Sequence, residues 1–259
     1  MNPESDRFRR YREALLDPQK GYIVVKGLYS NEEVQAYRRH CEELATCLPR
    51  LDKRINTSNS RDYIHYRSHD RFHRTRRIYQ FHHNHIDDYE GRFFHRALAF
   101  REGIESGWDH CKAYRRKRET LLNFSIATHY QPGFGRLARH KDSFSDHKYP
   151  LLQSLLLLSS HSVDYRGGDF ILYTAGGKAV SIQSDLELAV GDLLCFDKSL
   201  EHEVTTTYAP ELVGNGPGRH VGRWSLLIGV RAMLHSYRQL VWRRIIGSPL
   251  LQPFRSSTF

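Results

Sequence analysis

Residues 191–204 read GDLLCFDKSLEHEV, and this stretch decides the fold. Gly191 and Asp192 form a turn signal, and the apolar residues LLCF that follow have the length of one strand. A short apolar run that begins at a turn is typical of a buried strand. From His202 onward the chain is rich in β-branched residues, which favour a second strand. The stretch therefore predicts two short strands of a mainly β domain.

The same pattern of short apolar runs separated by turn residues extends over residues 119–234. Turn pairs such as Pro132-Gly133 and Gly176-Gly177 separate most of the apolar runs. The runs predict eight strands, at about 120–130, 137–141, 152–159, 168–173, 179–184, 192–197, 202–208 and 223–231. Many short strands at such spacing indicate a sandwich or barrel. With helices in front of them, they predict an α+β fold with a mainly β core, a double-stranded β-helix (a cupin-like jelly roll) with N-terminal helices packed on one sheet.

Residues 1–118 carry helical patterns and most of the clustered charge. We expect a short helix at 8–16 and a strand between the glycines of 21–27. A helix from Ser30 to about Leu44 would have Glu33 at the capping-box spacing, and 90–118 reads as helical with a break at Gly103. We therefore expect a single domain over 1–259. Its parts are helical support and a substrate lid in 1–118, the β core in 119–234 and a C-terminal extension in 235–259.

Composition limits the function classes. No apolar run approaches the ~20 residues of a membrane span, and the N-terminus shows no signal peptide, so the cytoplasm is the expected compartment. The four cysteines lack C-x-x-C spacing, which argues against a zinc site. A formal net charge of +10 favours anionic partners, but a solvated basic surface explains it better, because no Lys/Arg run exceeds a few residues. The sequence does not indicate an oligomeric state.

A candidate metal site is formed by three residues. His140 and Asp142 stand at i and i+2, so on an extended strand both side chains leave the same face. His202 would complete a set of two imidazoles and one carboxylate, which leaves three positions of an octahedron open, as in non-haem iron(II) oxygenases. A second H-x-D, His85 and Asp87, lacks comparable motifs after it. We therefore predict His140, Asp142 and His202 as catalytic metal ligands.

Several motifs follow one another in a fixed order in the core. They are Tyr130-x-x-Gly133, His140-x-Asp142, Gly167-Gly168-Asp169-Phe170, Gly191-Asp192, His202-Glu203-Val204 and Arg223-x-Ser225. In this set, residues 120–234 resemble the iron(II)/2-oxoglutarate-dependent dioxygenase superfamily, with motifs most similar to its prolyl-4-hydroxylase-like branch. The strand at 21–27 and the helix after it also resemble the phytanoyl-CoA-hydroxylase-like branch.

The resemblance implies iron(II) as cofactor, with 2-oxoglutarate and O2 as cosubstrates. By position, Arg223 would pair with the distal carboxylate of 2-oxoglutarate, since guanidinium and carboxylate match through two parallel hydrogen bonds. Ser225 and Tyr130 would add hydrogen bonds to the same cosubstrate. Family members often have this arginine closer to the distal histidine, and the longer gap here leaves Arg219 as the alternative.

The resemblance also implies a reaction. We expect hydroxylation of an unactivated C–H of a free amino acid or an amino-acid-derived small molecule, as in natural product biosynthesis, with release of succinate and CO2. The substrate would carry a carboxylate or another charged group. Arg74, Arg76 or Arg77 could hold such an anion, Glu119 could meet a substrate ammonium, and Trp242 could close the pocket.

Three alternatives to this reading stay open. A peptidyl or protein hydroxylase would need an open groove. A nucleic-acid demethylase would suit the basic charge, but the R-x-N-x-T-x-R pattern of that branch is absent from residues 223–231, which read RWSLLIGVR, so the sequence disfavours nucleic acid. A binding module without chemistry is opposed by the intact set of ligands and by Arg223.

Overall fold

The computed structural model describes residues 3–47, 50–51, 64–69, 73–81, 89–108, 121–142, 152–211 and 221–232. Its helices are α1 (Pro3–Leu16), α2 (Asn31–Cys47) and α3 (Tyr89–Glu105). The first strands are β1 (Tyr22–Val25), β2 (Arg50–Leu51), β3 (Ile64–His69), β4 (His73–Phe81), β5 (Leu121–Tyr130), β6 (Arg136–His140) and β7 (Leu152–Leu157). They are followed by β8 (Arg166–Gly167), β9 (Phe170–Tyr173), β10 (Ala179–Ser181), β11 (Leu193–Asp197), β12 (Glu201–Val204), β13 (Thr207–Tyr208) and β14 (Arg223–Ala232).

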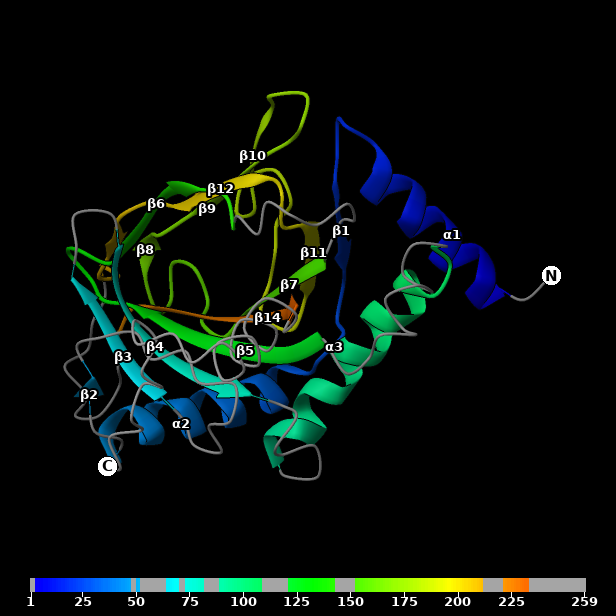
Figure 1. Ribbon diagram of the computed structural model, residues 1–259. Helices are drawn as coiled ribbons and strands as arrows, with labels where there is room; N and C mark the ends of the chain where they lie inside the picture. Colours follow the sequence, from blue (N-terminus) through cyan, green and yellow to red (C-terminus); the bar gives the residue numbers. More distant parts are fainter. Residues whose placement is uncertain are drawn as a thin grey trace, which may run out of the picture.

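One sheet of twelve strands forms the body of the described chain. Its main path runs β1-β11-β7-β14-β5-β4-β6-β12-β9-β10, and every pairing along that path is antiparallel. The sheet folds over, so that β6, β12 and β9 face β5, β14 and β7 (Figure 1). β4 pairs with both β5 and β6 and thereby joins the two layers. The chain is thus mainly antiparallel β with a few helices.

Two apolar clusters lie on opposite sides of the larger layer, which contains β1, β11, β7, β14 and β5. The smaller layer contains β6, β12, β9 and β10. The first joins the three helices to one face of β7, β11 and β14, and the second fills the space between the layers. Successive residues of β14 alternate between them, since side chains of a strand point to opposite faces. Trp224 and Leu226 belong to the helix side, whereas Leu227 packs against the inter-layer cluster. Arg223 and Ser225 share the alternation of Leu227 and therefore face the inside.

Each of the eight core strands predicted from the sequence has a counterpart. β5, β6, β7, β9, β10, β11, β12 and β14 lie at the expected places, and two short strands, β8 and β13, pair with each other as a separate ribbon. Around β1 the flanking glycines adopt positive φ, +70° at Gly21 and +60° at Gly27, as a strand between two turns requires. The prediction of a β core is therefore confirmed.

The predicted helices also form, with one difference in α3. The expected break at Gly103 is wrong, because α3 continues through it to Glu105. A Cβ at Gly103 would lie 2.5 Å from the ring of Phe8, so the glycine lets α1 approach α3 closely. Its sequence signal marks a packing contact between helices and not a helix end.

The first half is more than helical support. Besides β1, it contributes the β3–β4 hairpin, and β4 is inserted between β5 and β6. The hairpin strands read IHYRSH and HRTRRIYQF, in which clustered arginines and histidines hide the apolar alternation of a half-buried strand. Residues 1–118 therefore contribute strands to the sheet as well as the expected helices.

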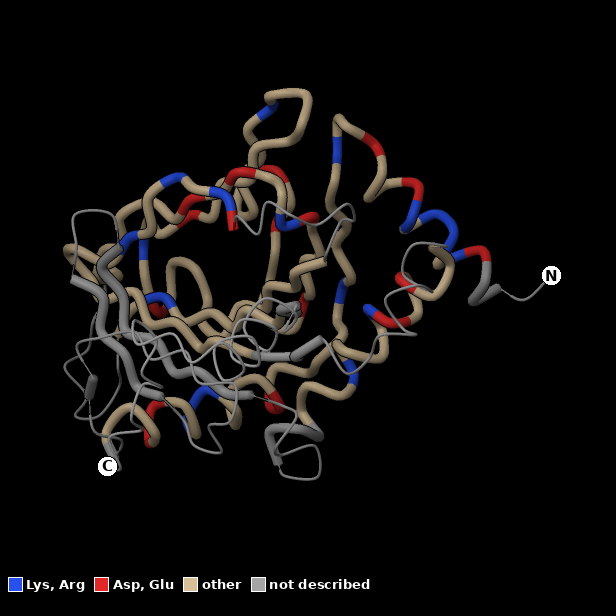
Figure 2. The backbone as a smooth tube through the Cα atoms, viewed as in Figure 1, with Lys and Arg blue, Asp and Glu red and all other residues tan. Residues whose placement is uncertain are grey.

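Charged residues of both signs occur along α1 (Figure 2), whereas β7, in the middle of the sheet, has the uncharged sequence LQSLLL. Among the described residues, the structure has no helix that is both long and apolar enough to cross a membrane.

Candidate metal centre

Two histidines meet because their strands are neighbours in the smaller layer. His140 is the last residue of β6, His202 lies in β12, and the two are directly paired in the antiparallel register. Their ring centroids are 4.4 Å apart. His202 is buried against Phe170 and Phe196, whose ring centroids lie 5.3 and 5.5 Å away. The inter-layer core therefore holds the His202 ring in place.

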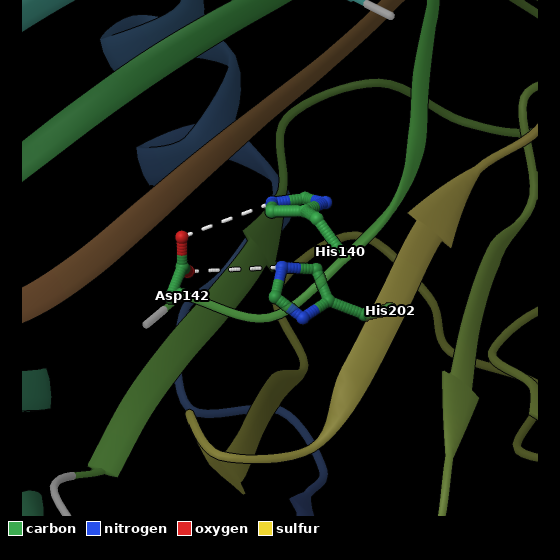
Figure 3. A group of neighbouring side chains, drawn as sticks. All are labelled: His140, Asp142 and His202. Carbon is green, nitrogen blue, oxygen red and sulfur yellow. Dashed lines mark ion pairs between the residues drawn. The ribbon is translucent and has the colours of Figure 1, made fainter. Parts of the chain in front are cut away.

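Asp142 faces both imidazoles (Figure 3). Its Oδ1 lies 3.8 Å from His140 Nε2, and its Oδ2 lies 3.7 Å from His202 Nε2. One ligand atom of each residue lies within 4.8 Å of those of the other two, close enough for one cation. The sequence placed His140 and Asp142 on one strand, but β6 ends at His140. The carboxylate thus reaches the site from the segment after the strand.

The hydrogen bonds of the imidazoles define their tautomers. His140 Nδ1 lies 2.8 Å from the carbonyl oxygen of Ala138, and His202 Nδ1 lies 3.1 Å from that of Leu200. A carbonyl oxygen only accepts, so each Nδ1 carries the proton and donates it. In the neutral ring, Nε2 then carries the lone pair on the side that faces Asp142, and hydrogen bonds of this kind orient histidine ligands in metal sites.

A glutamine that the sequence did not single out completes this centre. Gln153, in β7, is 5% exposed, and its Nε2 donates a hydrogen bond of 2.7 Å to Asp142 Oδ2. No motif marks Gln153, because it reaches Asp142 only after β7 has taken its place in the opposite layer.

Arg223 is fully buried at the start of β14, opposite Tyr130 in the β5 register. Its Nη1 donates a hydrogen bond of 3.1 Å to Ser225 Oγ, and its guanidinium lies 5.0 Å from the ring centroid of Tyr130. The structure thus brings the three predicted cosubstrate residues together. Within the described chain, Arg223 Nε and Nη2 have no hydrogen-bond partner, so two donors on one edge of the guanidinium are available.

Other residues around Arg223 were not singled out for this role. The Tyr165 hydroxyl accepts a hydrogen bond of 3.3 Å from Gln183 Nε2. Burial raises the pKa of Tyr165, and the positive charge of Arg223 opposes that rise. A Cβ at Gly168 would lie 3.1 Å from Arg223 Cδ and 2.8 Å from Thr207 Oγ1. In the sequence, only the Gly167-Gly168 pair could have indicated these neighbours, because glycine lets the backbone pass close to Arg223.

The predicted substrate residues are placed only in part. Arg74, Arg76 and Arg77 lie in β4, where Arg74 is paired with Arg136 of β6 and Arg76 with His129 of β5, but their side chains lie outside the described part. Glu119 and Trp242 lie outside the described residues. So do the alternative arginine, Arg219, and the second H-x-D motif. The substrate roles therefore stay predictions.

The sequence matches the profile of one protein family. Residues 73–204 match Oxygenase-NA, described as "Oxygenase, catalysing oxidative methylation of damaged DNA". The match spans half of the chain, from the start of β4 to the end of β12. The chain belongs to this family. All three candidate ligands of this Oxygenase-NA member lie inside the matched segment, whereas Arg223 lies beyond it. No curated protein matches the sequence.

Solved structures share the fold of this Oxygenase-NA member. A prolyl-4-hydroxylase from Pseudomonas putida has a TM-score of 0.55 at 15% identity, with 87% of this chain and 98% of that chain covered. A prolyl hydroxylase from Trichoplax adhaerens, in complex with a hypoxia-inducible-factor peptide, has a TM-score of 0.54 at 12% identity and covers 92% and 93%. SnoN, a non-haem α-ketoglutarate-dependent epimerase from nogalamycin biosynthesis, has a TM-score of 0.54 at 13% identity and covers 88% and 83%. At these identities the likeness concerns the fold alone.

Proposed function

We propose that this oxygenase depends on iron(II) and 2-oxoglutarate, with iron bound by His140, Asp142 and His202. The convergence of two Nε2 lone pairs and one carboxylate carries this proposal. Two nitrogen ligands and one oxygen ligand suit iron(II) and leave three coordination positions for the cosubstrates. When bound, the iron would supply the activation of O2, coupled to decarboxylation of 2-oxoglutarate into succinate and CO2.

The residues around Arg223 support 2-oxoglutarate as the cosubstrate. Its distal carboxylate would pair with the free Nε–Nη2 edge of the guanidinium, a geometry that forms two parallel charge-assisted hydrogen bonds. Ser225 already accepts from Nη1, which holds the guanidinium in place. Tyr130 covers the other side with its ring. A buried guanidinium with unused donors is costly unless an anion binds there.

We infer a double-stranded β-helix from the strand order. Going along the chain, β5, β7, β11 and β14 fall in one layer, and β6, β9, β10 and β12 fall in the other. The core thus alternates between layers except at the β9–β10 hairpin, and the metal ligands come from the layer that contains β6 and β12. We further propose that 1–259 is a single domain, with a lid in 1–118, the core in 119–234 and an extension in 235–259.

The first candidate substrate is a free amino acid or an amino-acid-derived small molecule, oxidised at an unactivated C–H. Arg74, Arg76 or Arg77 of β4 would supply the partner for the charged group of such a small molecule. A peptide of a protein substrate is the related alternative and would need an open groove. In either case this chain's residues would bind and orient the substrate C–H beside the metal and exclude water.

The second candidate substrate is methylated nucleic acid. Two observations favour it over the sequence-based expectation: the description of the Oxygenase-NA family names damaged DNA, and the strands β3 and β4 are rich in arginine and contain no acidic residue. Arg67 and Arg76 occupy directly opposite register positions, as do Arg74 and Arg136 across β4 and β6. Arginines gathered at neighbouring register positions would suit a phosphate backbone, whose charges lysine and arginine neutralise.

Succinate release tests the proposed reaction. With iron(II) and 2-oxoglutarate, the wild type should form succinate, and amino acids, peptides and methylated oligonucleotides should be compared for stimulation of turnover. Asp142→Ala and His202→Ala should each abolish succinate formation, because each removes one metal ligand. His85→Ala, which alters the second H-x-D motif, is the matched control and should leave succinate formation unchanged.

Full activity of His202→Ala would contradict the metal assignment. Succinate formation in the wild type that none of the three substrate classes stimulates would retain the reaction and reject all three classes.

A further inference from the structure

Gln153 is a buried polar residue that neither the ligand set nor the cosubstrate pocket uses. It lies near the start of β7, between β11 and β14 in the middle of the larger layer. It alternates with Leu155 and Leu157, both of which belong to the inter-layer cluster, so its side chain faces the inside. Gln153 therefore projects from a central strand into the space that the metal centre occupies.

The Gln153 amide has one possible orientation. Asp142 Oδ2, an acceptor, lies 2.7 Å from Nε2, so the amino group faces the carboxylate and the amide oxygen faces away. Oε1 is buried and has no hydrogen-bond partner among the described residues. Leaving a buried acceptor unpaired costs about 1–3 kcal/mol. A stability role alone would not select a glutamine here, because an apolar side chain would avoid this cost.

Asp142 needs such a restraint more than the two histidines do. It lies beyond the end of β6, and its side chain is 31% exposed. The imidazoles are each held by a hydrogen bond to a carbonyl two residues back in the chain, whereas Asp142 Oδ2 accepts a hydrogen bond from the other layer. The Gln153 bond holds Oδ2 facing His202 and leaves Oδ1 facing His140.

We propose that Gln153 is a positioning residue that holds the Asp142 carboxylate in its metal-binding orientation. This inference rests on the proposed function, because it assigns Asp142 as a ligand. Partners that orient metal ligands in this way typically contribute about 10–100-fold to metal affinity or activity.

Binding of Co(II) to the metal-free protein, followed by its visible absorption without 2-oxoglutarate or O2, tests this role. Gln153→Leu removes the donor at similar volume and should weaken Co(II) binding about 10–100-fold and change the absorption band that reports coordination geometry. Gln153→Met, with an unbranched side chain, is the second variant in case Leu disturbs folding. Ser154→Ala is the matched control, since Ser154 points to the helix side of β7 and contacts Cys195.

The thermal unfolding of the metal-free variants separates positioning from packing. The melting temperature of Gln153→Leu should be no lower than that of Ser154→Ala. The variant loses the hydrogen bond to Asp142, but it also loses the buried, unpaired acceptor Oε1, which offsets that loss. Wild-type Co(II) affinity and absorption in both Gln153 variants, with binding lost in Asp142→Ala, would overturn the positioning role and leave the proposed function standing. Wild-type Co(II) binding by Asp142→Ala would overturn the metal assignment itself.

Discussion

At the scale of single residues, Arg223 shows how a binding role conflicts with stability. Its guanidinium is fully buried and uses one nitrogen on Ser225, while two nitrogens have no partner within the described chain. Arg38 is the contrasting case. It is also buried, but its guanidinium pairs with Glu42 and Asp164 at 2.9 Å each. The paired arginine fits a structural role, whereas the incompletely paired one fits a ligand that is still to bind.

Arg223→Met should separate binding from folding. Without 2-oxoglutarate, this variant should melt at the wild-type temperature or above it, because an apolar side chain replaces an incompletely paired buried charge. Added 2-oxoglutarate should stabilise the wild type and leave the variant unchanged. Thermal melting with and without 2-oxoglutarate measures both effects.

Arg38→Met is the control for Arg223→Met. This substitution leaves the partly buried carboxylates of Glu42 and Asp164 without their arginine partner, so the melting temperature should fall. A large loss of stability in Arg223→Met without 2-oxoglutarate would assign Arg223 to the core instead of the cosubstrate.

At the scale of elements, α2 illustrates a helix start that local sequence specifies. Ser30 and Glu33 form the predicted reciprocal cap: Ser30 N donates to Glu33 Oε2 at 2.8 Å, and Glu33 N donates to Ser30 Oγ at 3.2 Å. Tertiary structure then adds a third partner from α3, since Arg96 Nη2 lies 2.7 Å from Glu33 Oε1. These bonds lower the pKa of Glu33, with Arg96 as the main cause.

The cap should make part of the stability depend on pH. Because the pKa of Glu33 is lower in the folded state, its contribution is complete above the unfolded pKa and is lost as the pH falls through the folded pKa. Urea unfolding should therefore show Glu33→Gln less stable than the wild type at neutral pH, with the difference shrinking as the pH falls through the acidic range. Arg96→Gln completes a double-mutant cycle. An equal difference at both pH values would contradict the role of the ionised carboxylate.

Ser30→Ala tests the other half of the same cap. It should cost about 1 kcal/mol of stability, the usual contribution of an N-cap serine. The same urea titration at neutral pH measures it, and a change within error would show that Glu33 and Arg96 suffice to start the helix.

At the scale of the whole molecule, a net charge of +10 affects binding of an anionic partner only where basic residues lie close together. The β3–β4 hairpin concentrates arginines beside the strand that ends at His140. If nucleic acid is the substrate, binding of a single-stranded oligonucleotide should weaken steeply as salt rises, because bound phosphates release counterions. Fluorescence anisotropy over a series of salt concentrations measures this slope.

Single hairpin variants should locate the contacts. Arg67→Ala and Arg76→Ala should each reduce the salt slope by about 0.7, the share of one phosphate contact on a single strand. Arg9→Ala is the control, because Arg9 lies on α1 and is already paired with Asp6 and Glu13. Binding that salt does not affect would favour the small-molecule candidate.

Much of the fold follows from the sequence by itself. A local apolar run and a turn predict each core strand, and Ser30 with Glu33 three residues later predicts the α2 cap. These features can be predicted because they depend only on residues that are close in the sequence. The ligand set could also be proposed from spacing and motif order. Only the folded chain decides that β4 inserts between β5 and β6, that Gln153 reaches Asp142, and that Arg223 is buried with donors to spare. These depend on which distant strands pair and on how the two layers close, and local patterns carry no information about either.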